Sequence, residues 1–314
     1  MPAPDPHAML LPDLQTSGDL IADRRFTYAL ALLNDKDGTA AKDLLDQVLE
    51  RVPHWPPALL ALGDACLLVQ DEQGAVNAFS ACLADDPSDR LGAGPRLARL
   101  QQIPPDHAIR PAYVAALFDD YAKRFDQHLL ETLDYSAPQQ INAALSGYGA
   151  QYERAYDLGC GTGLMGDVLR PYSRWLGGCD LSAAMLNEAK RKALYDHLDH
   201  ADCIEALERY EAQTYDLVTA ADVLVYIGAL NSVFHSVQRV LKPSGLFAFT
   251  TQACEGDGFI IGADLRAAHS QTYVIAQAQA ARLDCLTCQP VSVRKDRDQP
   301  VAGWLCLLRP HQAV

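Results

Sequence analysis

The stretch RAYDLGCGTGLMG, residues 154–166, decides the fold of this chain. An apolar run leads into three glycines at alternate positions, Gly159, Gly161 and Gly163. Glycine adopts backbone angles that are closed to other residues, and it places no side chain between the backbone and a ligand. A glycine-rich turn between a strand and a helix presents backbone amides to a polar or negatively charged group. We therefore expect residues 157–163 to hold a ligand at the end of a first parallel strand.

The sequence beyond this loop alternates short apolar runs with helical stretches. WLGGCDL, YDLVTAADVLVYI and GLFAFTTQ read as buried strands, and SAAMLNEAKRKAL and NSVFHSVQRVL read as helices. This alternation predicts βαβ units and a largely parallel sheet. The second strand ends in Asp180. A carboxylate at that place can accept hydrogen bonds from both hydroxyls of a ribose.

Two classes of enzyme share this glycine pattern. Gly161-Thr-Gly163-Leu-Met-Gly166 also satisfies the G-x-G-x-x-G fingerprint of dinucleotide-dependent dehydrogenases, with Asp180 as the acidic partner. A single glycine-rich match does not separate the two classes, so the surrounding motifs must decide.

Across residues 110–310 the chain resembles the class I S-adenosylmethionine-dependent methyltransferases. In that family an acid precedes the first glycine, as Asp157 does, and the second-strand acid is followed by a serine and a methionine, as in DLSAAML. The family's methionine, here Met185, typically lies against the adenine. An acid after the third strand, matched by Asp202, meets the adenine amino group, and the backbone amide of Cys203 adds a donor.

The order of these motifs, followed by VLKPSGLFAF at the turn into a fifth strand, favours the methyl donor over a nicotinamide cofactor. The resemblance implies S-adenosylmethionine as cofactor. It implies that the binding residues are Asp157, Gly159, Cys160, Gly161, Gly163, Asp180, Leu181, Met185, Asp202, Cys203, Ala220 and Asp222.

The N-terminal part follows a different pattern, with a period of 34 residues over 19–103. At that offset Ala29 aligns with Gly63, and Leu45 with Phe79. Small residues recur where helices approach closely, and larger apolar residues recur where one unit packs on the next. The period resembles the tetratricopeptide repeat, in which stacked helix pairs bury one continuous core. We expect two repeats and a capping helix.

The predicted architecture is an α/β protein in three parts. An all-α, tetratricopeptide-like helical domain at 1–105 precedes bridging or lid helices at 106–150 and a Rossmann-like, seven-stranded class I methyltransferase domain at 151–314. This combination, with the bridge FDDYAKRFDQHLLETLDY, resembles a group of bacterial repeat-containing predicted methyltransferases. The resemblance implies a reversed final hairpin over 281–309 with a turn in KDRDQP.

Methyl transfer from a sulfonium is a direct displacement, for which alignment and exclusion of water supply most of the rate. Tyr121 and Phe125 on the bridge are candidates for covering the methionine end of the cofactor; the alternative is that they pack the bridge helix on the sheet. His128 and His269 are candidate general bases, with structural roles as their alternative. Tyr226 is a candidate for the wall of the acceptor pocket. A carboxylate acceptor would need no base.

The composition limits the classes of partner that we expect for this protein. The formal net charge of −14 disfavours nucleic acid, which needs a basic footprint. No apolar run approaches the roughly 20 residues that span a bilayer, so we expect no membrane segment. Nine scattered cysteines without an export signal predict free thiols in a cytoplasmic protein. We expect no metal site, because the pairs His197/His200 and Cys285/Cys288 lack the companion ligands of a closed zinc site.

Two hypotheses for the acceptor remain open. The first is an oxygen or nitrogen atom of a small molecule or small peptide. The second is a protein methyltransferase whose repeats recruit the target protein, because stacked helix pairs often form concave peptide-binding surfaces.

Overall fold

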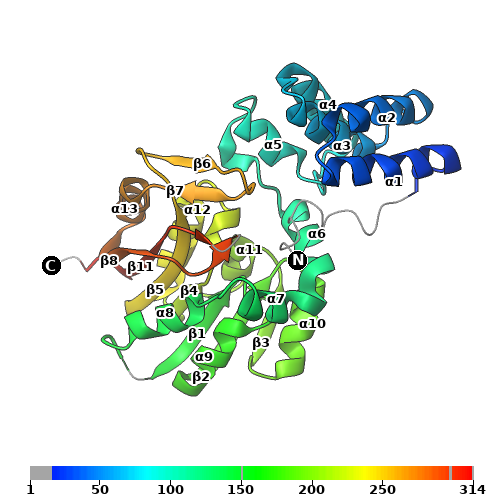
Figure 1. Cartoon of the computed structure of the whole chain (residues 1–314). Helices are drawn as coiled ribbons and strands as arrows, with labels where there is room; N and C mark the ends of the chain where they lie inside the picture. Colours follow the sequence, from blue (N-terminus) through cyan, green and yellow to red (C-terminus); the bar gives the residue numbers. More distant parts are fainter. Residues whose placement is uncertain (1–15, 150, 297–298, 313–314) are drawn as a thin grey trace. The chain divides into compact units, whose positions relative to one another are not determined.

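The computed structural model describes residues 16–149, 151–296 and 299–312 and divides the chain into two compact units (Figure 1). A helical unit ends at Ala116, and a sheet unit runs from Leu117. The division falls inside helix α6 and therefore inside the segment 106–150 that we predict as a bridge. The predicted domain limits remain a prediction.

The helical unit contains two successive helix pairs. Its elements are α1 (Leu20–Asn34), α2 (Gly38–Arg51), α3 (Pro56–Leu68), α4 (Glu72–Asp85), α5 (Ala93–Arg99), the short 3-10 helix η1 (Pro105–His107) and the start of α6 (Pro111–Tyr121). Helix α1 packs on α2, and α3 packs on α4.

The helix pairs recur with the predicted period. Asp37 caps α2 and Asp71 caps α4 at positions 34 apart, and each carboxylate accepts a backbone amide of the first turn. A Cβ on Gly63 would lie 2.2 Å from the ring of Phe79, so α3 and α4 approach as closely as the small residue allows. The N-terminal part is thus helical and periodic, as predicted. Its membership of the tetratricopeptide family remains a prediction.

The sheet unit is built on one large mixed sheet. Its strands are β1 (Tyr152–Leu158), β2 (Ser173–Asp180), β3 (His197–His200), β4 (Tyr215–Ala220), β5 (Leu241–Ala253), β6 (Phe259–Ile261), β7 (Ala267–His269), β8 (Leu283–Val291) and β11 (Gly303–Pro310). The main path has the order β3-β2-β1-β4-β5-β11-β8. Strands β1 to β5 pair in parallel, whereas β11 is antiparallel to both β5 and β8.

The sheet has nine strands, whereas the sequence predicted seven. The seven-strand path includes the predicted reversed hairpin of β8 and β11. The two extra strands, β6 and β7, form an antiparallel pair after β5, and β7 adds to the end of β5 through Gln252 and Ala253. The short strands β9 (Lys295–Asp296) and β10 (Gln299–Pro300) pair separately within the stretch KDRDQP, where the turn was predicted. Residues 297–298 of that stretch lie outside the described residues.

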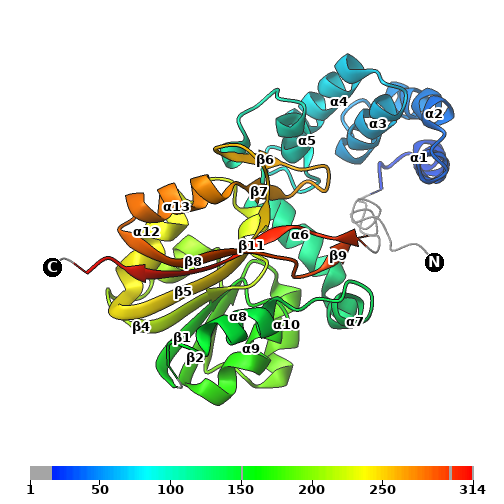
Figure 2. The ribbon, with the colours of Figure 1, turned by 60° about the vertical axis from the view of Figure 1, so that its left-hand side comes forward.

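Helices cover both faces of the sheet (Figure 2). One core holds side chains such as Leu176, Leu217 and Leu305, and the other holds Phe234, Phe247 and other aromatic and branched residues. The helical elements of this unit are the end of α6, η2 (Ala122–Arg124), α7 (Phe125–Glu131), α8 (Ala137–Leu145), α9 (Leu164–Leu169), η3 (Arg170–Tyr172), α10 (Ala183–Lys192), α11 (Cys203–Glu208), η4 (Leu224–Tyr226), α12 (Asn231–Val240) and α13 (Gln271–Ala280).

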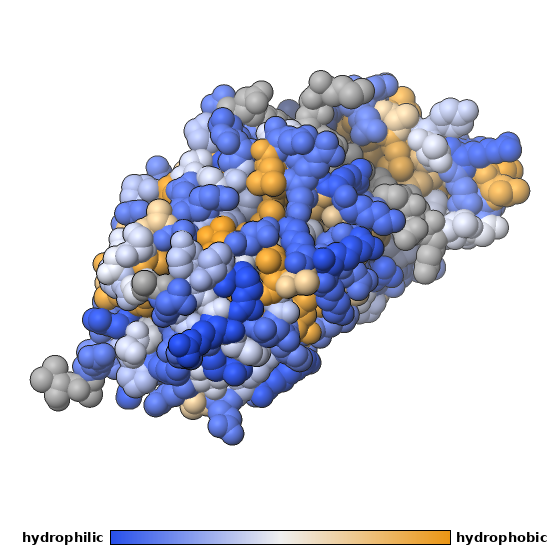
Figure 3. All heavy atoms as spheres, turned by 90° about the horizontal axis from the view of Figure 1, so that it is seen from below, coloured by the Kyte–Doolittle hydropathy of each residue, from blue (hydrophilic) through white to orange (hydrophobic). Residues whose placement is uncertain are grey.

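The face of the molecule in Figure 3 is covered mainly by hydrophilic residues, with small, separate hydrophobic groups between them. This agrees with the formal net charge of −14. Within the described part of the chain, no helix combines the length and the apolar character needed to cross a lipid bilayer.

Candidate functional site

The glycine loop lies between β1 and α9, as predicted. Gly159, Gly161 and Gly163 all have positive φ angles, of 58°, 54° and 92°. These values fall in the region that other residues rarely adopt. A Cβ on Gly159 would lie 2.5 Å from the side chain of Val223, so this loop also approaches the segment after β4. Glycine is required here for both conformation and space.

Asp180 joins the loop to the end of β2. One carboxylate oxygen accepts the amide of Gly161 at 2.9 Å, and the other accepts the amide of Ser182 at 2.8 Å. Burial raises the pKa of Asp180 to about 6, although both amides favour its ionised form. Each oxygen keeps a further lone pair, so the carboxylate can still accept hydrogen bonds from a ligand.

Asp157 lies beneath the loop and is 1% exposed. Its carboxylate accepts the hydroxyl of Tyr195 at 2.7 Å and that of Thr219 at 2.9 Å. Burial raises the pKa of this carboxyl to about 7, against the effect of the two hydroxyls. These contacts tie β1 to β4 and to the chain after α10, so they fix the position of the loop. The predicted contact of Asp157 with the cofactor remains a prediction.

The neighbouring residues of the motif are mostly buried. The amide of Cys160 donates to the carbonyl of Cys179 at 2.8 Å, which links the loop to β2. Leu181 accepts His200 Nε2 at its carbonyl at 2.9 Å. Met185, on the first turn of α10, is 1% exposed, and its amide is capped by the Ser182 hydroxyl at 3.0 Å.

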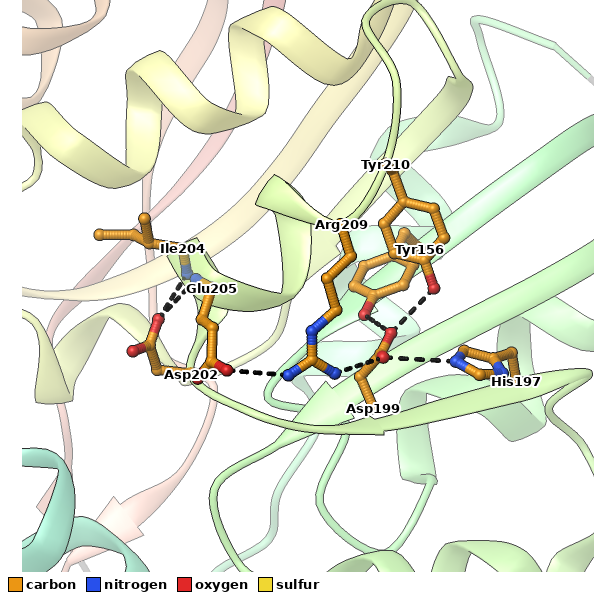
Figure 4. Close-up of polar contacts among 8 residues, drawn as sticks. All are labelled: Tyr156, His197, Asp199, Asp202, Ile204, Glu205, Arg209 and Tyr210. Atoms are coloured by element: carbon orange, nitrogen blue, oxygen red, sulfur yellow. Dashed lines mark hydrogen bonds and ion pairs between the residues drawn. The ribbon is translucent and has the colours of Figure 1, made fainter.

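Two acids after β2 have different surroundings (Figure 4). Asp202 caps α11: its Oδ1 accepts the amides of Ile204 at 2.8 Å and Glu205 at 2.9 Å. Its Oδ2 has no partner in the described part of the chain, so this atom can accept a hydrogen bond from a ligand. The predicted contact of Asp202 with the adenine amino group remains a prediction. The predicted donor role of the Cys203 amide is likewise still a prediction.

Asp199, which the sequence analysis did not single out, is the buried acid of this region (Figure 4). Its carboxylate accepts the hydroxyls of Tyr156 at 2.7 Å and Tyr210 at 2.8 Å, and it pairs with Arg209 at 2.8 Å. His197 lies 3.3 Å away. Burial opposes ionisation, but these partners outweigh it and lower the pKa of Asp199. The group stabilises the fold beside the site.

The chain after β4 places a second group of side chains at the same edge of the sheet. Ala220 is fully buried at the end of β4. Asp222 has a φ of 58°, and its amide donates to the Thr250 hydroxyl at 2.9 Å. Its carboxylate lies 3.2 Å from the guanidinium of Arg294. The hydroxyl of Tyr226 accepts Arg266 Nε at 3.1 Å.

The bridge segment reaches the glycine loop. A Cβ on Gly161 would lie 3.9 Å from Phe125, so this ring faces the loop. The ring of Tyr121 lies 5.2 Å from that of Phe125, and the ring of Phe118 lies 5.3 Å from that of Tyr226. We call residues 118–131 the lid segment.

Two acids of the lid segment, which the sequence analysis missed, attach it to the site. Asp119 accepts the hydroxyl of Ser182 at 2.6 Å and the amide of Ala184 at 3.2 Å. Asp126 hydrogen-bonds to the hydroxyl of Thr162 and lies 2.9 Å from Lys192 Nζ. The pair Phe-Asp occurs at 118–119 and again at 125–126, seven positions apart, and this repeat was the available signal.

The two candidate histidines differ in what surrounds them. His128 Nδ1 hydrogen-bonds to the hydroxyl of Tyr121, whereas its Nε2 is buried and without a partner in the described chain. Burial, with a smaller effect from Arg124, lowers the pKa of His128, so its imidazole is neutral near pH 7.

His269 is fully buried in β7, and both of its ring nitrogens are occupied. Nδ1 lies 2.6 Å from the Thr251 hydroxyl, and Nε2 donates to the carbonyls of Ile227 at 3.0 Å and Gly228 at 2.9 Å. Burial lowers the pKa of His269 to about 4. This geometry gives no support to the predicted role of His269 as a general base. Protonation of Nδ1 would break the hydrogen bond that this nitrogen accepts from the Thr251 hydroxyl. His269 is better described as a structural residue that joins β7 to the chain after β4.

Metal-ligating side chains do not gather in this region. Within residues 16–149, 151–296 and 299–312, no three His, Cys, Asp or Glu side chains are grouped so that they could hold a metal ion. Cys288 and Cys306 lie opposite each other on β8 and β11, with their sulfur atoms 3.1 Å apart.

Comparison with known proteins gives the following matches. Residues 156–247 match the family model described as a methyltransferase domain. The chain is 34% identical over 142 residues to a malonyl-[acyl-carrier protein] O-methyltransferase of Enterobacter lignolyticus, covering 45% of this chain and 54% of that protein. It is 27% identical over 137 residues to a ubiquinone biosynthesis O-methyltransferase of Klebsiella pneumoniae, covering 41% and 57%. The chain thus spans about half the length of these relatives.

A solved structure of an S-adenosylmethionine-dependent methyltransferase from Clostridium acetobutylicum aligns with a TM-score of 0.48 at 19% identity, covering 62% of this chain and 99% of that one. The family match and the curated relatives agree with the class of enzyme predicted from the motifs. Residues 156–247 are therefore similar to a methyltransferase domain.

Proposed function

We propose that this protein transfers the methyl group of S-adenosylmethionine to an oxygen or nitrogen atom of a small molecule or small peptide. The observation that carries the proposal is the position of Asp180, whose carboxylate bridges the amides of Gly161 and Ser182. A carboxylate fixed beside a glycine loop at the end of the second strand suits the two hydroxyls of a ribose. The two relatives named above are both O-methyltransferases, which favours oxygen as the acceptor atom.

The residues around the loop fit the parts of this cofactor. Beside Gly161 the nearest atom to an added Cβ is 3.9 Å away, so a ligand can approach the backbone there. Asp180 would accept the ribose hydroxyls, and Asp202 Oδ2 would accept the adenine amino group. Met185 would support the adenine from α10. Phe125 and Tyr121 would cover the methionine end.

When bound, the cofactor supplies an electrophilic methyl group on a sulfonium. The chain's own contribution is to position the acceptor and to keep water away. The lid segment serves the second purpose, because Asp119 and Asp126 hold its aromatic rings over the loop. Aromatic faces also suit the positive charge of a sulfonium.

An acceptor hydroxyl or amine must lose a proton. His128 is the side chain that the proposal assigns to this step, because its pKa is lowered and its Nε2 has no partner in the described chain. Proton transfer to Nε2 would leave an imidazolium whose Nδ1 stays hydrogen-bonded to Tyr121. A carboxylate acceptor would bypass this step, since it is already ionised.

A labelling experiment tests the proposed reaction. The purified protein is incubated with trideuteromethyl S-adenosylmethionine and a small-molecule extract, and products are analysed by mass spectrometry. We expect deuterated products that Asp180→Ala abolishes and that Asp296→Asn, on exposed β9, leaves unchanged. Equal products from the wild type and Asp180→Ala would contradict the proposed role of Asp180.

A protein acceptor is the second candidate, and the 34-residue recurrence of helix pairs favours it, because stacked pairs form peptide-binding surfaces. Tyr28 on α1 is 69% exposed and offers a way to test it. Under this alternative, Tyr28→Ala raises KM for a protein acceptor and leaves cofactor binding unchanged. Under the small-molecule proposal, the same variant leaves KM for the small-molecule acceptor and the affinity for the cofactor unchanged.

A further inference from the structure

Arg266 is a cation at the edge of the proposed site, and in the described part of the chain no carboxylate pairs with its guanidinium. It lies in the turn between β6 and β7, where the Gly262 amide donates to the Arg266 carbonyl at 2.8 Å. Its Nε donates to the hydroxyl of Tyr226 at 3.1 Å, and its guanidinium carbon lies 5.5 Å from the centre of that ring. The backbone turn and the aromatic ring together fix the direction of the side chain.

The carboxylates nearby are taken by a different arginine. Arg294, which is 6% exposed, lies 3.2 Å from Asp222 and 3.8 Å from Asp264. Within the described chain, no carboxylate lies within 4.0 Å of the Arg266 guanidinium, and its two terminal nitrogens have no hydrogen-bond partner. Burial opposes the charge of Arg266, but Tyr226, Asp222 and Asp264 outweigh it and raise its pKa, so the side chain stays cationic.

Aromatic contacts connect this cation to the glycine loop. Tyr226 packs edge-on against Phe118 at 5.3 Å, Phe118 packs against Phe125 at 6.0 Å, and Phe125 faces Gly161. Arg266 therefore lies beside the rings of the lid segment on the side that follows β4 and β5. Tyr226, to which Arg266 is bonded, is the side chain that the sequence analysis names as a candidate for the wall of the acceptor pocket.

We propose that Arg266 binds a carboxylate group of the methyl acceptor, so that the substrates of this enzyme are small carboxylic acids. This rests on the proposed function. A guanidinium with two free terminal nitrogens can form a pair of parallel hydrogen bonds to a carboxylate, which gives orientation as well as affinity.

A binding experiment on the full chain tests the inference. The protein is first titrated with S-adenosylhomocysteine by calorimetry, and the saturated complex is then titrated with glutarate as a short dicarboxylate probe. We expect Arg266→Met to weaken glutarate binding about tenfold or more, as for loss of a charge-assisted hydrogen-bond pair. Arg266→Lys should restore part of it, and S-adenosylhomocysteine binding should change less than about twofold.

Arg174→Met is the matched control, because this arginine is exposed and pairs with Glu153 away from the site. It should leave glutarate binding unchanged. The inference is overturned if the wild-type complex does not bind glutarate, if inorganic phosphate binds as tightly at the same site, or if Arg174→Met has the same effect. Weaker S-adenosylhomocysteine binding in Arg266→Met would assign Arg266 to the cofactor instead. A wild type that does not bind S-adenosylhomocysteine contradicts the proposed function itself.

Discussion

The carboxylate of Asp119 accepts a hydrogen bond of 2.6 Å from the hydroxyl of Ser182, 63 positions further along the chain. Ser182 is also the N-cap of α10 and follows Asp180 by two residues. This contact therefore connects the lid segment directly to the strand end that we assign to the ribose. Asp126 makes the equivalent connection to the glycine loop through Thr162.

Removing both connections should open the lid segment. In the double variant Asp119→Ala/Asp126→Ala, we expect S-adenosylhomocysteine to bind roughly tenfold more weakly, because the hydrogen bonds and the ion pair of both carboxylates are lost. We also expect faster cleavage by trypsin after Lys123 and Arg124, which lie in the lid segment. Calorimetry and limited proteolysis measure the two effects.

Asp120 supplies the control for that prediction. It is adjacent to Asp119 but forms an exposed pair with Arg124, at 3.1 Å. Asp120→Ala should leave cofactor affinity unchanged. If it weakens binding as much as the double variant does, the two contacts have no special role.

Cofactor affinity should depend on pH through Asp180. The pKa of this carboxyl is raised to about 6, so it is protonated below that pH and ionised above it. The ionised form accepts both ribose hydroxyls, so S-adenosylhomocysteine should bind more tightly as the pH rises from about 5 to about 7. Asp180→Asn should flatten this dependence. Wild-type affinity that falls over the same range would have the wrong sign for this account.

Asp199 should matter for stability and not for cofactor binding. Asp199→Asn replaces a carboxylate that accepts from two tyrosines and pairs with Arg209, and we expect a loss of about 2–4 kcal/mol in the free energy of unfolding at pH 7. Because the folded-state pKa is lowered, this contribution is complete above the ordinary value of 3.8 and is lost as the pH falls below it. The difference in the free energy of unfolding between wild type and variant, measured in urea, should therefore become smaller as the pH falls below 3.8. Unchanged stability at pH 7 would show that the cluster is not stabilising.

Packing in the helical unit gives a further prediction. A Cβ on Gly63 would lie 2.2 Å from the Phe79 ring, so Gly63→Ala should destabilise this unit by about 1–3 kcal/mol through overpacking. Gly147→Ala is the control, because an added Cβ there meets no described atom within 4 Å. Chemical unfolding followed by circular dichroism compares the two. Equal effects would show that the contact with Phe79 does not set the result.

Much of the fold and part of the candidate site could be predicted from local sequence patterns. The glycine spacing and Asp180 depend on backbone conformation next to a strand end, and both were predictable because the requirement lies in adjacent residues. The helix period of the N-terminal part was predictable for the same reason, because it is a pattern of neighbouring elements. The reversed final hairpin was expected from the family resemblance. The extra strands β6 and β7 were not, since three-residue strands give too short a pattern to recognise.

The contacts that complete the site depend on tertiary structure. Asp119 and Asp126 look like surface acids of a helix, and their partners lie on other elements. In HLDHAD, residues 197–202, the pleat of β3 turns Asp199 inward to Tyr156, whereas Asp202 follows the strand and caps the next helix. His269 became a packing residue because β7 adds to β5, which its own sequence does not indicate.

The central claim is that the site around Asp180 binds S-adenosylmethionine. Calorimetric titration of the full chain with S-adenosylmethionine, S-adenosylhomocysteine and NAD tests it most directly. We predict binding of both S-adenosyl compounds with one site per chain, strong loss of that binding in Asp180→Ala, and no binding of NAD. Binding of NAD without binding of either S-adenosyl compound would contradict the account.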